Sequence, residues 1–458
     1  MSPGAPGAVT AETVQEAVDL LKELVALDTT NPPGDEIKAV EHIKPLLERD
    51  GAEVRVFESA PKRGNLWARV KGRGSAKPFL ITAHLDVVGA KKEGWESDPF
   101  KAEERGGYLY GRGVLDDKAM AAAGVTVLRL LARSMAPLER DVVLFLSADE
   151  EAGSGQGMAW MLKNHPELLE AEAVLNEGGR IVIENGRITH AAVQNYEKLY
   201  LDVALSAEGP SGHSSMPRPG DAITRLSRAV ARVGAYEFPV RLNQVTRAYF
   251  SGLSRLPAHP LGKEFSMLVS RKRGPAFREA VRKITSDPAY NAGLRTTCAP
   301  TVVQAGFRSN AIPSSARADV NCRVLPNDDP RKIVEKLREV IGDPAVKVSA
   351  GQAEKPALSP EDHPFFRCVR SVLGEMAPGA VTAPYMSAGA TDSRELRRRG
   401  LNAYGLAPFP VTLGDEGRMH GDNERLMLSS VSFGLEFLYR LTVRFAAAPV
   451  PSDALRGP

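Results

Sequence analysis

The stretch from residue 78 to 89, PFLITAHLDVVG, ends an apolar run in His84 and Asp86. In extended chain, residues two apart project to the same side, so these two side chains share a face. An Asp placed there can accept the second ring N–H of a metal-bound His and fix its tautomer and orientation. The alternative is a strand-end histidine beside a solvent-facing Asp, and the pair alone does not decide between them.

Further acidic residues stand where predicted strands run out into loops. They are Asp116 and Asp117 in YGRGVLDDKAM, Glu150 and Glu151 in DVVLFLSADEEAG, and Glu177 in AVLNEGG; His420 lies in a later loop, LGDEGRMHGDNERL. In open α/β sheets, ligands bind beyond the carboxyl ends of the strands, so these side chains would share one pocket. Clustered carboxylates raise each other's pKa values, and two divalent metals would relieve that repulsion. Mixed nitrogen and oxygen ligands suit zinc, with cobalt or manganese as substitutes.

Each of these pieces has a simpler explanation when it is taken alone. Acidic pairs after a strand are usually solvated, GRG before a helix can be only a tight turn, and His420 can be a surface residue. The five other histidines outside such settings are predicted to be structural or exposed: His42, His165, His190, His259 and His363. Only the joint order and spacing of the pieces favours chemistry.

Alternating helical and strand patterns predict the elements that would position this cluster. Residues 11 to about 178 alternate in the way that is typical of a sheet covered by helices. Near Tyr196 the pattern changes to β-α-β-β-α-β, a ferredoxin-like α+β unit, and α/β character returns after Gln352. We therefore expect an α/β catalytic domain in two parts, 1–195 and 353–458, with an inserted domain over 196–352. A long Arg-rich segment near 238–300 interrupts that inserted domain and is mostly helical by pattern.

Composition excludes several classes of protein. The chain has 458 residues, and 59 Lys and Arg against 56 Asp and Glu leave a net charge of +3, so we expect no nucleic-acid partner. No apolar stretch approaches the ~18 residues of a membrane span, and no secretory signal is visible. Three distant cysteines, Cys298, Cys322 and Cys368, predict neither a disulfide framework nor a cysteine zinc site, which favours a cytoplasmic protein.

The pieces AHLDVV, YGRGVLDDKAM, SADEEAG, NEGG and MHG together resemble one family. It is the dinuclear zinc family of aminoacylases, acetylornithine deacetylases, succinyl-diaminopimelate desuccinylases and glutamate carboxypeptidases. GVLDDK, DEEAGSGQG, NEGG and ATDSR are most similar to the carboxypeptidase S and N-acyl amino acid hydrolase subgroup. The resemblance implies a catalytic domain of the zinc-exopeptidase kind, with a mixed central sheet flanked by helices, and an inserted lid.

The resemblance also implies a set of metal ligands for two zinc ions per chain. One metal would take His84 and Glu177, the other Glu151 and His420, and Asp116 would bridge them. Members of the family often have a cis peptide just after the bridging Asp, which would make Asp117 structural. Asp86 would orient His84.

Glu150 would be the general base of the reaction. Two metals in such sites hold a water and lower its pKa towards neutral. Glu150 would take the proton as the resulting hydroxide attacks an amide carbonyl, and then deliver it to the leaving nitrogen.

Substrate-binding residues are implied in the same way. They are His213 in EGPSGHSSMP, Asn310 and Arg323 in GFRSNAIPSSARADVNCRV, and Arg394 in ATDSR, beside Thr391 and Asp392. The family's lid His stabilises the oxyanion, and Arg suits bidentate carboxylate binding. Ala390 replaces the Gly of the desuccinylase pattern, which argues against that reaction.

These residues predict a dizinc hydrolase that cleaves an amide or peptide bond next to a free carboxylate. The substrate would be a small molecule or a peptide, and N-acyl amino acid hydrolase, dipeptidase and carboxypeptidase all stay open. A homodimer through the lid is implied by the resemblance, whereas the long insertion argues against it. The alternative function is a non-catalytic, metal-binding homologue that serves as a ligand-binding or assembly protein. A serine or cysteine hydrolase has little support, because no G-x-S-x-G motif occurs.

Overall fold

The computed structural model describes residues 9–447, apart from residues 75, 135–136, 258, 271 and 354. The first eight residues, part of the segment searched for a secretory signal, lie outside this range. The chain forms two compact units. The first unit comprises Met1–Asn195, Ala357–Tyr385 and Thr391–Pro458, and the second comprises Tyr196–Pro356 and Met386–Ala390.

The first unit is built on a ten-stranded mixed sheet in the order β1-β2-β6-β3-β7-β17-β9-β8-β18, with β16 paired to β9. The strands are β1 (Glu53–Glu58), β2 (Gly64–Val70), β3 (Ala76–His84), β6 (Arg140–Ser147), β7 (Ala173–Asn176), β8 (Arg180–Glu184), β9 (Arg187–Glu197), β16 (Val381–Ser387), β17 (Ala403–Gly405) and β18 (Pro410–Val411). The neighbours β6, β3, β7 and β17 run parallel, whereas β2 and β9 are antiparallel to the strands beside them. The carboxyl ends of β3, β6 and β7 therefore meet at one edge of the sheet.

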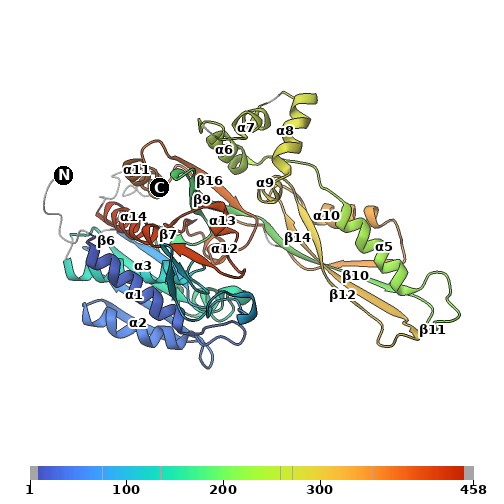
Figure 1. The fold of residues 1–458 in the computed structure, drawn as a ribbon, viewed down its shortest axis with the longest axis horizontal. Coiled ribbons are helices and arrows are strands. Elements are labelled where there is room, and N and C mark those ends of the chain that lie inside the picture. The colour runs from blue at the N-terminus through green and yellow to red at the C-terminus, as the bar shows by residue number, and fades with distance from the viewer. Residues whose placement is uncertain are drawn as a thin grey trace, which may run out of the picture. The chain divides into compact units, whose positions relative to one another are not determined.

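Helices cover both faces of this sheet, as the alternating pattern predicted. The larger apolar core lies under α1 (Ala11–Ala26), α2 (Ile37–Arg49), α3 (Lys118–Ser134), α11 (Pro364–Met376) and α14 (Leu428–Ala447). Figure 1 shows α1, α3 and α14 packed beside one another. A smaller core on the other face lies under α4 (Met158–Asn164) and α12 (Ser393–Arg398). The predicted cap of the first helix is present, because the Thr10 side chain accepts a hydrogen bond from the N–H of Thr13.

Short elements complete the first unit. They are a three-stranded sheet of β4 (Glu103–Arg105), β5 (Tyr108–Tyr110) and β19 (Arg425–Met427), and the single turn α13 (Leu413–Glu416). No helix in the described part of the chain is long and apolar enough to cross a bilayer.

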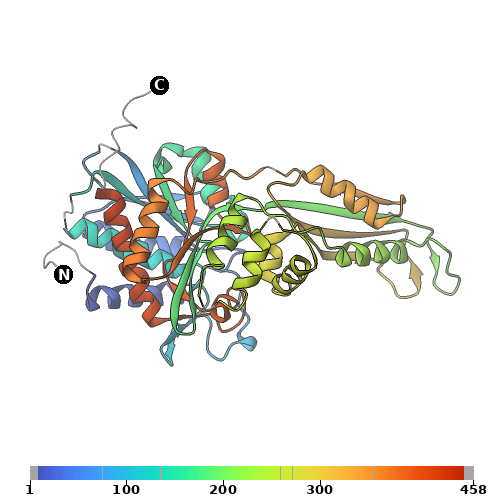
Figure 2. The same cartoon turned by 90° about the horizontal axis from the view of Figure 1, so that it is seen from above.

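The second unit has the predicted ferredoxin-like order of elements. They are β10 (Leu199–Glu208), α5 (Ala222–Ala235), β12 (Thr297–Ala305), β14 (Ser315–Val324), α10 (Pro330–Ile341) and β15 (Val346–Ala350), and the sheet order is β12-β14-β10-β15. Figure 2 shows α5 (green) and α10 (orange) running alongside the strands, with which they share an apolar core. A small pair of strands, β11 (Gly212–His213) and β13 (Ala311–Ile312), extends from it. The segment between α5 and β12 is helical, with α6 (Gln244–Leu253), α7 (Gly262–Val269), α8 (Pro275–Thr285) and α9 (Pro288–Leu294).

The expectation that the cysteines form no disulfide is wrong. Cys298 on β12 and Cys322 on β14 are bonded, with their Cα atoms 4.0 Å apart and a separation of 24 positions in sequence. The two residues face each other directly in the antiparallel register of the strands. The spacing of cysteines along the chain does not reveal which residues face each other across two strands. Cys368 is free, as expected.

Candidate metal and catalytic site

Three neighbouring strands of the first unit deliver acidic and imidazole groups to one edge of the sheet. His84 is the last residue of β3, and Glu177 follows β7 directly. Glu150 and Glu151 lie in a short 3-10 turn after β6. Because β6, β3 and β7 are parallel neighbours, the loops that carry these side chains lie side by side.

Asp116 lies between two histidines. Its Oδ1 is 2.9 Å from Nε2 of His84, and its Oδ2 is 2.9 Å from Nε2 of His420. Nε2 of His420 is also 3.2 Å from Oε1 of Glu151. Ligand atoms of His84, Asp116 and Glu151 all lie within 4.8 Å of one another. Each oxygen of the Asp116 carboxylate therefore faces a different imidazole.

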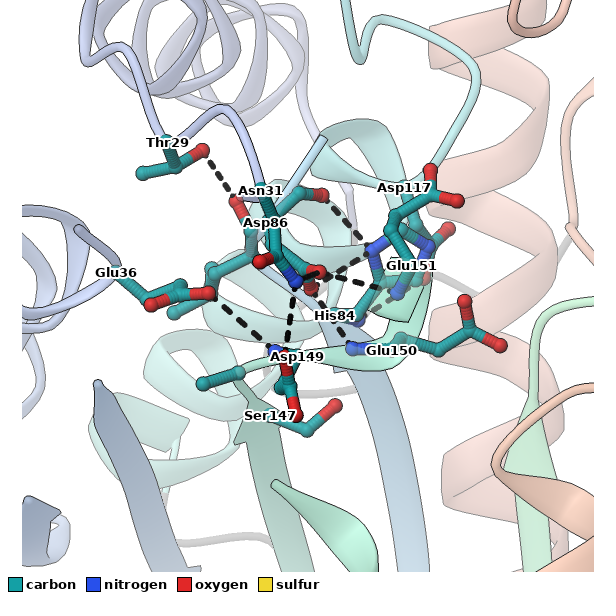
Figure 3. A network of polar contacts seen from close by, with 12 residues as sticks. Thr29, Asn31, Glu36, His84, Asp86, Asp117, Ser147, Asp149, Glu150 and Glu151 are labelled. Atoms are coloured by element: carbon teal, nitrogen blue, oxygen red, sulfur yellow. Dashed lines mark hydrogen bonds and ion pairs between the residues drawn. The ribbon is translucent and has the colours of Figure 1, made fainter. Parts of the chain in front are cut away.

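The His84 ring is held from behind by Asp86, though not by the group that the sequence suggested. Its Nδ1 lies 2.9 Å from the backbone carbonyl oxygen of Asp86 and 3.5 Å from the carboxylate. The carboxylate instead accepts hydrogen bonds from the backbone N–H groups of Glu150 (3.1 Å) and Glu151 (3.0 Å), and from the Asn31 side chain (2.8 Å) (Figure 3). Asp86 thus ties the end of β3 to the loop after β6.

Asp117 contacts the β3 backbone at His84. The peptide bond between Asp116 and Asp117 is cis. The buried carboxylate of Asp117 accepts the backbone N–H of His84 at 3.3 Å. The structure therefore gives the two adjacent aspartates different surroundings.

A buried pair, Arg112 and Glu424, supports the Asp116 loop, and the sequence analysis missed it. Nη1 of Arg112 donates to Glu424 at 2.6 Å, and Nη2 donates to the carbonyl of Gly421 at 2.9 Å. Glu424 also accepts the backbone N–H groups of Leu115 (2.8 Å) and Asp116 (3.2 Å). The signal in the sequence is the Arg of GRG together with an acidic residue four positions after His420.

A second buried network was also missed, and it supports the loop after β6. Nη2 of Arg63 donates to Glu36 at 2.7 Å and to Asp149 at 2.9 Å. The side chain of Asn31 donates hydrogen bonds to both Asp149 (3.0 Å) and Asp86 (Figure 3). The segment TTNPP, which follows α1, therefore contacts the site. The partners are far apart in sequence, and only the polar run NPPGDE between two predicted helices marks the place.

Burial, hydrogen bonds and neighbouring charges shift the pKa values of the cluster strongly. Burial raises the pKa of Glu177, and the charge of Glu150 raises it further. Burial likewise raises the pKa of Glu150 well above its usual value. Hydrogen bonds to Asp116 and Glu151 raise the pKa of His420 to about 10. Burial opposes ionisation of Asp116, but hydrogen bonds from His420 and His84 hold its pKa well below its usual range.

This donor set fits a divalent metal. Imidazole nitrogens and carboxylate oxygens are the ligands that zinc takes in proteins, and those of His84, Asp116 and Glu151 lie within 4.8 Å of one another. Burial, with neighbouring carboxylates in addition, raises the pKa values of Glu150 and Glu177, and a bound cation would favour their charged forms.

The ATDSR segment forms hydrogen bonds with residues beside two of the loops that carry the cluster. Asp392 accepts hydrogen bonds from Ser147, at the end of β6 (2.8 Å), and from Ser154, beyond Glu151. Oγ of Ser393 accepts from the side chain of Asn176, at 3.1 Å, just before Glu177. Arg394, predicted to bind substrate, pairs with its neighbour Glu395, with Nη2 and Oε1 3.1 Å apart.

The other three predicted substrate-binding residues lie in the second unit. His213 on β11 is exposed, with Nδ1 2.7 Å from the Ser215 hydroxyl. The backbone carbonyl of Asn310 accepts the N–H of Ser214 at 3.1 Å, so His213 and Asn310 belong to one hairpin-like tip. Arg323 lies near the far end of β14, where its guanidinium is 4.8 Å from the ring centre of Tyr200. Within this unit the structure groups His213 with Asn310 but not with Arg323.

A cavity of about 90 Å³ opens beside Asp116 and Glu177. Its apolar lining consists of Leu115, Ala407, Phe409, Val411 and Met419. The ion pair of Arg180 and Glu416 forms a polar side of the cavity. The acidic cluster thus borders a compact apolar space.

Comparisons with known proteins identify the class of protein that carries this site. Residues 80–444 match the model of peptidase family M20/M25/M40. Human N-fatty-acyl-amino acid synthase/hydrolase PM20D1 is 31% identical over 387 residues, covering 80% of this chain and 74% of the relative. A probable carboxypeptidase S-like protein of Dictyostelium discoideum is 31% identical over 378 residues, covering 80% and 71%.

Solved structures agree with this result at the level of the fold. The M20 metallo-carboxypeptidase Sso-CP2 of Sulfolobus solfataricus superposes with a TM-score of 0.71 at 18% identity, covering 93% of this chain and 98% of the other. Human carnosine dipeptidase 1 gives 0.69 at 14% identity, covering 95% and 97%. The chain belongs to peptidase family M20/M25/M40. It is therefore a hydrolase of amide bonds. The family that was predicted from the sequence is confirmed.

Proposed function

We propose that the protein is a dizinc amidohydrolase that cleaves an amide or peptide bond next to a free carboxylate. The observation that carries this proposal is the Asp116 carboxylate, which presents one oxygen to His84 and the other to His420. Asp116 would be shared by two zinc ions, of which one would also be held by His84 and Glu177 and the other by Glu151 and His420. Cobalt or manganese would fit the same donors.

Glu150 is the general base in this proposal. Two zinc ions held by these residues would polarise the substrate carbonyl and lower the pKa of a water molecule towards neutral. Glu150 takes a proton from the attacking water and passes it to the leaving nitrogen. Burial raises the pKa of Glu150 above its usual value, which suits a group that must both accept and give a proton. Its position is fixed through its backbone N–H, which donates to Asp86.

The apolar cavity supports a substrate with a compact apolar group. The cavity of about 90 Å³ has apolar side chains on one side and charged side chains on the other, so it suits a small group with an apolar face. Arg323 would bind the substrate carboxylate through paired hydrogen bonds. The names of the two relatives, an N-fatty-acyl-amino acid hydrolase and a carboxypeptidase, both support a substrate that ends in a free amino acid carboxylate.

The test is amine release, followed by mass spectrometry, from a mixed panel incubated with the zinc-loaded enzyme. The panel holds N-acyl amino acids of varied chain length, simple dipeptides, and the carboxyl-amidated counterpart of each. Cleavage confined to the free acids is the expected result, and the preferred members name the substrate class. Equal cleavage of the amidated set would contradict the carboxylate requirement. Silence across the panel with two zinc ions bound would contradict the catalytic proposal.

A further inference from the structure

The helical insertion in the second unit carries a charge unlike that of the rest of the chain. Residues 238–300 contain 11 Lys and Arg against 3 Asp and Glu, a net charge of +8. The whole chain has a net charge of +3, so the remaining residues together carry −5. A concentrated positive field of this kind attracts anionic ligands. The charge by itself would also be explained by a solvated basic surface. The arrangement of the side chains distinguishes such a surface from a binding site for anions.

Three arginines of this segment surround a groove of about 360 Å³. They are Arg241, Arg247 and Arg273. Its apolar lining includes Leu242, Leu268 and Phe277, and none of the described residues that line it is acidic. The groove lies in the size range of small-molecule sites, roughly 300–1,000 Å³. It therefore combines concentrated positive charge with apolar surface.

Two of the guanidinium groups converge on the end of α7. Nη1 of Arg247 donates to the carbonyl of Val269 at 2.7 Å, and Nη1 of Arg273 donates to the carbonyl of Ser270 at 2.8 Å. The carboxyl end of a helix stabilises such cations. Arg273 also lies 4.1 Å from the ring centre of Phe277. A guanidinium has five N–H donors, so each group, although anchored, can bind a further acceptor.

The third arginine is balanced by a carboxylate. Nη1 of Arg241 donates to Asp328 at 2.7 Å, and the other oxygen of Asp328 accepts from the Thr296 hydroxyl at 2.7 Å. Among the described residues, no carboxylate pairs with Arg247 or Arg273, so these two arginines supply the net positive charge of the groove.

We propose that this groove binds an amphipathic anion. Arg247 and Arg273 hold its carboxylate or phosphate head, and its alkyl chain lies over Leu242, Leu268 and Phe277. Arginine is the side chain best suited to such planar or tetrahedral oxyanions. None of these residues belongs to the metal or catalytic set, so the site is additional to the amide-bond chemistry.

Isothermal titration calorimetry on the zinc-loaded full chain tests the proposal with three probes. They are octyl phosphate below its micellar concentration, inorganic phosphate, and the neutral amphiphile octyl glucoside. Octyl phosphate is expected to bind at least tenfold more tightly than either other probe. Equal affinity for inorganic phosphate would remove the apolar part of the proposal, and equal affinity for octyl glucoside would remove the anionic part.

Two matched double variants separate this groove from general charge. Arg247→Glu/Arg273→Glu should weaken octyl phosphate binding at least tenfold, whereas Arg278→Glu/Arg282→Glu, on the exposed side of α8, should change it less than twofold. The same loss in both variants would overturn the proposal. Arg247→Gln/Arg273→Gln, with the melting temperature checked by circular dichroism, replaces the first variant if that one does not fold, and the same tenfold loss is expected.

The anion can be the head group of a membrane lipid or a soluble amphiphile, and one further measurement distinguishes the two. The protein is sedimented with phosphatidylcholine vesicles that contain phosphatidylglycerol. Co-sedimentation that is lost in Arg247→Glu/Arg273→Glu assigns the head group to a lipid. Calorimetric binding of octyl phosphate without co-sedimentation assigns it to a soluble amphiphile.

Discussion

The Asp86 carboxylate accepts a hydrogen bond from the backbone N–H of Glu151 at 3.0 Å. The same carboxylate holds the N–H of Glu150 at 3.1 Å. Burial opposes its ionisation, but the nearby His84 ring and a hydrogen bond from Asn31 keep the pKa of the Asp86 carboxylate below its usual value, so it stays an acceptor. Asp86 therefore contacts the ring of the proposed ligand His84 and the backbone of two further residues. These are the proposed base Glu150 and the proposed ligand Glu151.

Asp86→Asn should reduce turnover without preventing folding. The amide NH₂ group cannot accept a hydrogen bond, so one backbone N–H of the loop after β6 loses its partner. Loss of such a support typically costs about 10- to 100-fold in activity or metal affinity. Steady-state kinetics and zinc content by mass spectrometry check this expectation. A kcat within twofold of wild type would contradict the positioning role.

Glu150→Gln should abolish the proton transfer but keep the metals. General base catalysis contributes roughly 10²- to 10⁴-fold, and kcat should fall by that range. Zinc content should stay unchanged, because Glu150 is not a ligand in the proposed arrangement. Full turnover in this variant would remove the assignment of the base, and loss of zinc would make Glu150 a ligand instead.

Zinc affinity should rise with pH. In the metal-free protein the pKa of His420 is raised to about 10, and the pKa values of His84 and Glu177 are also raised. Groups with raised pKa values hold their protons to higher pH and must release them to bind a metal, so affinity should increase between about pH 6 and 8. Calorimetry in buffers of different ionisation enthalpy measures the released protons. No proton release, with a pH-independent affinity, would be the contrary result.

Ala407→Leu should narrow the range of substrates. Its longer side chain would occupy part of the cavity beside Asp116 and Glu177. A pocket change of one or a few methylene groups shifts specificity by about 10- to 200-fold. The ratio of kcat/KM for a branched apolar acyl group to that for acetyl should therefore fall at least tenfold. An unchanged ratio would show that the acyl group binds elsewhere; the acetyl substrate is the internal control for folding.

Arg323→Lys should weaken recognition of the substrate carboxylate. A lysine keeps the charge but loses the planar pair of donors. The preference for a free acid over its amidated counterpart should fall roughly tenfold, a change of about 1.4 kcal/mol in transition-state binding. The ratio of kcat/KM values for the two substrates measures it, and an unchanged ratio would place the carboxylate elsewhere.

The sequence predicted the fold and the grouping of the acidic loops because both follow from short-range patterns. Strand periodicity and the rule for carboxyl ends of parallel strands place His84, Glu151 and Glu177 at one edge. The partner of the His84 ring was different, because the turn after β3 brings the Asp86 carbonyl closer than its carboxylate. That turn is not encoded in the alternation of apolar and polar residues.

Interactions between distant segments could not be predicted in this way. The bond between Cys298 and Cys322 depends on strand register, and the pair of Arg112 and Glu424 joins loops more than 300 residues apart. Spacing along one sequence does not contain such tertiary pairings. The Arg-rich insertion was visible as composition, but its groove formed by Arg247 and Arg273 was not, because both anchor on the end of a helix between them.

The most direct test of the central claim is the number of zinc ions per chain, measured by native mass spectrometry beside turnover. Two zinc ions per chain are expected in the wild type. Asp116→Asn should lose at least one of them together with turnover, because a single carboxylate faces both histidines. One zinc ion in both proteins, with turnover intact in the variant, would contradict the dizinc site and the bridging role of Asp116.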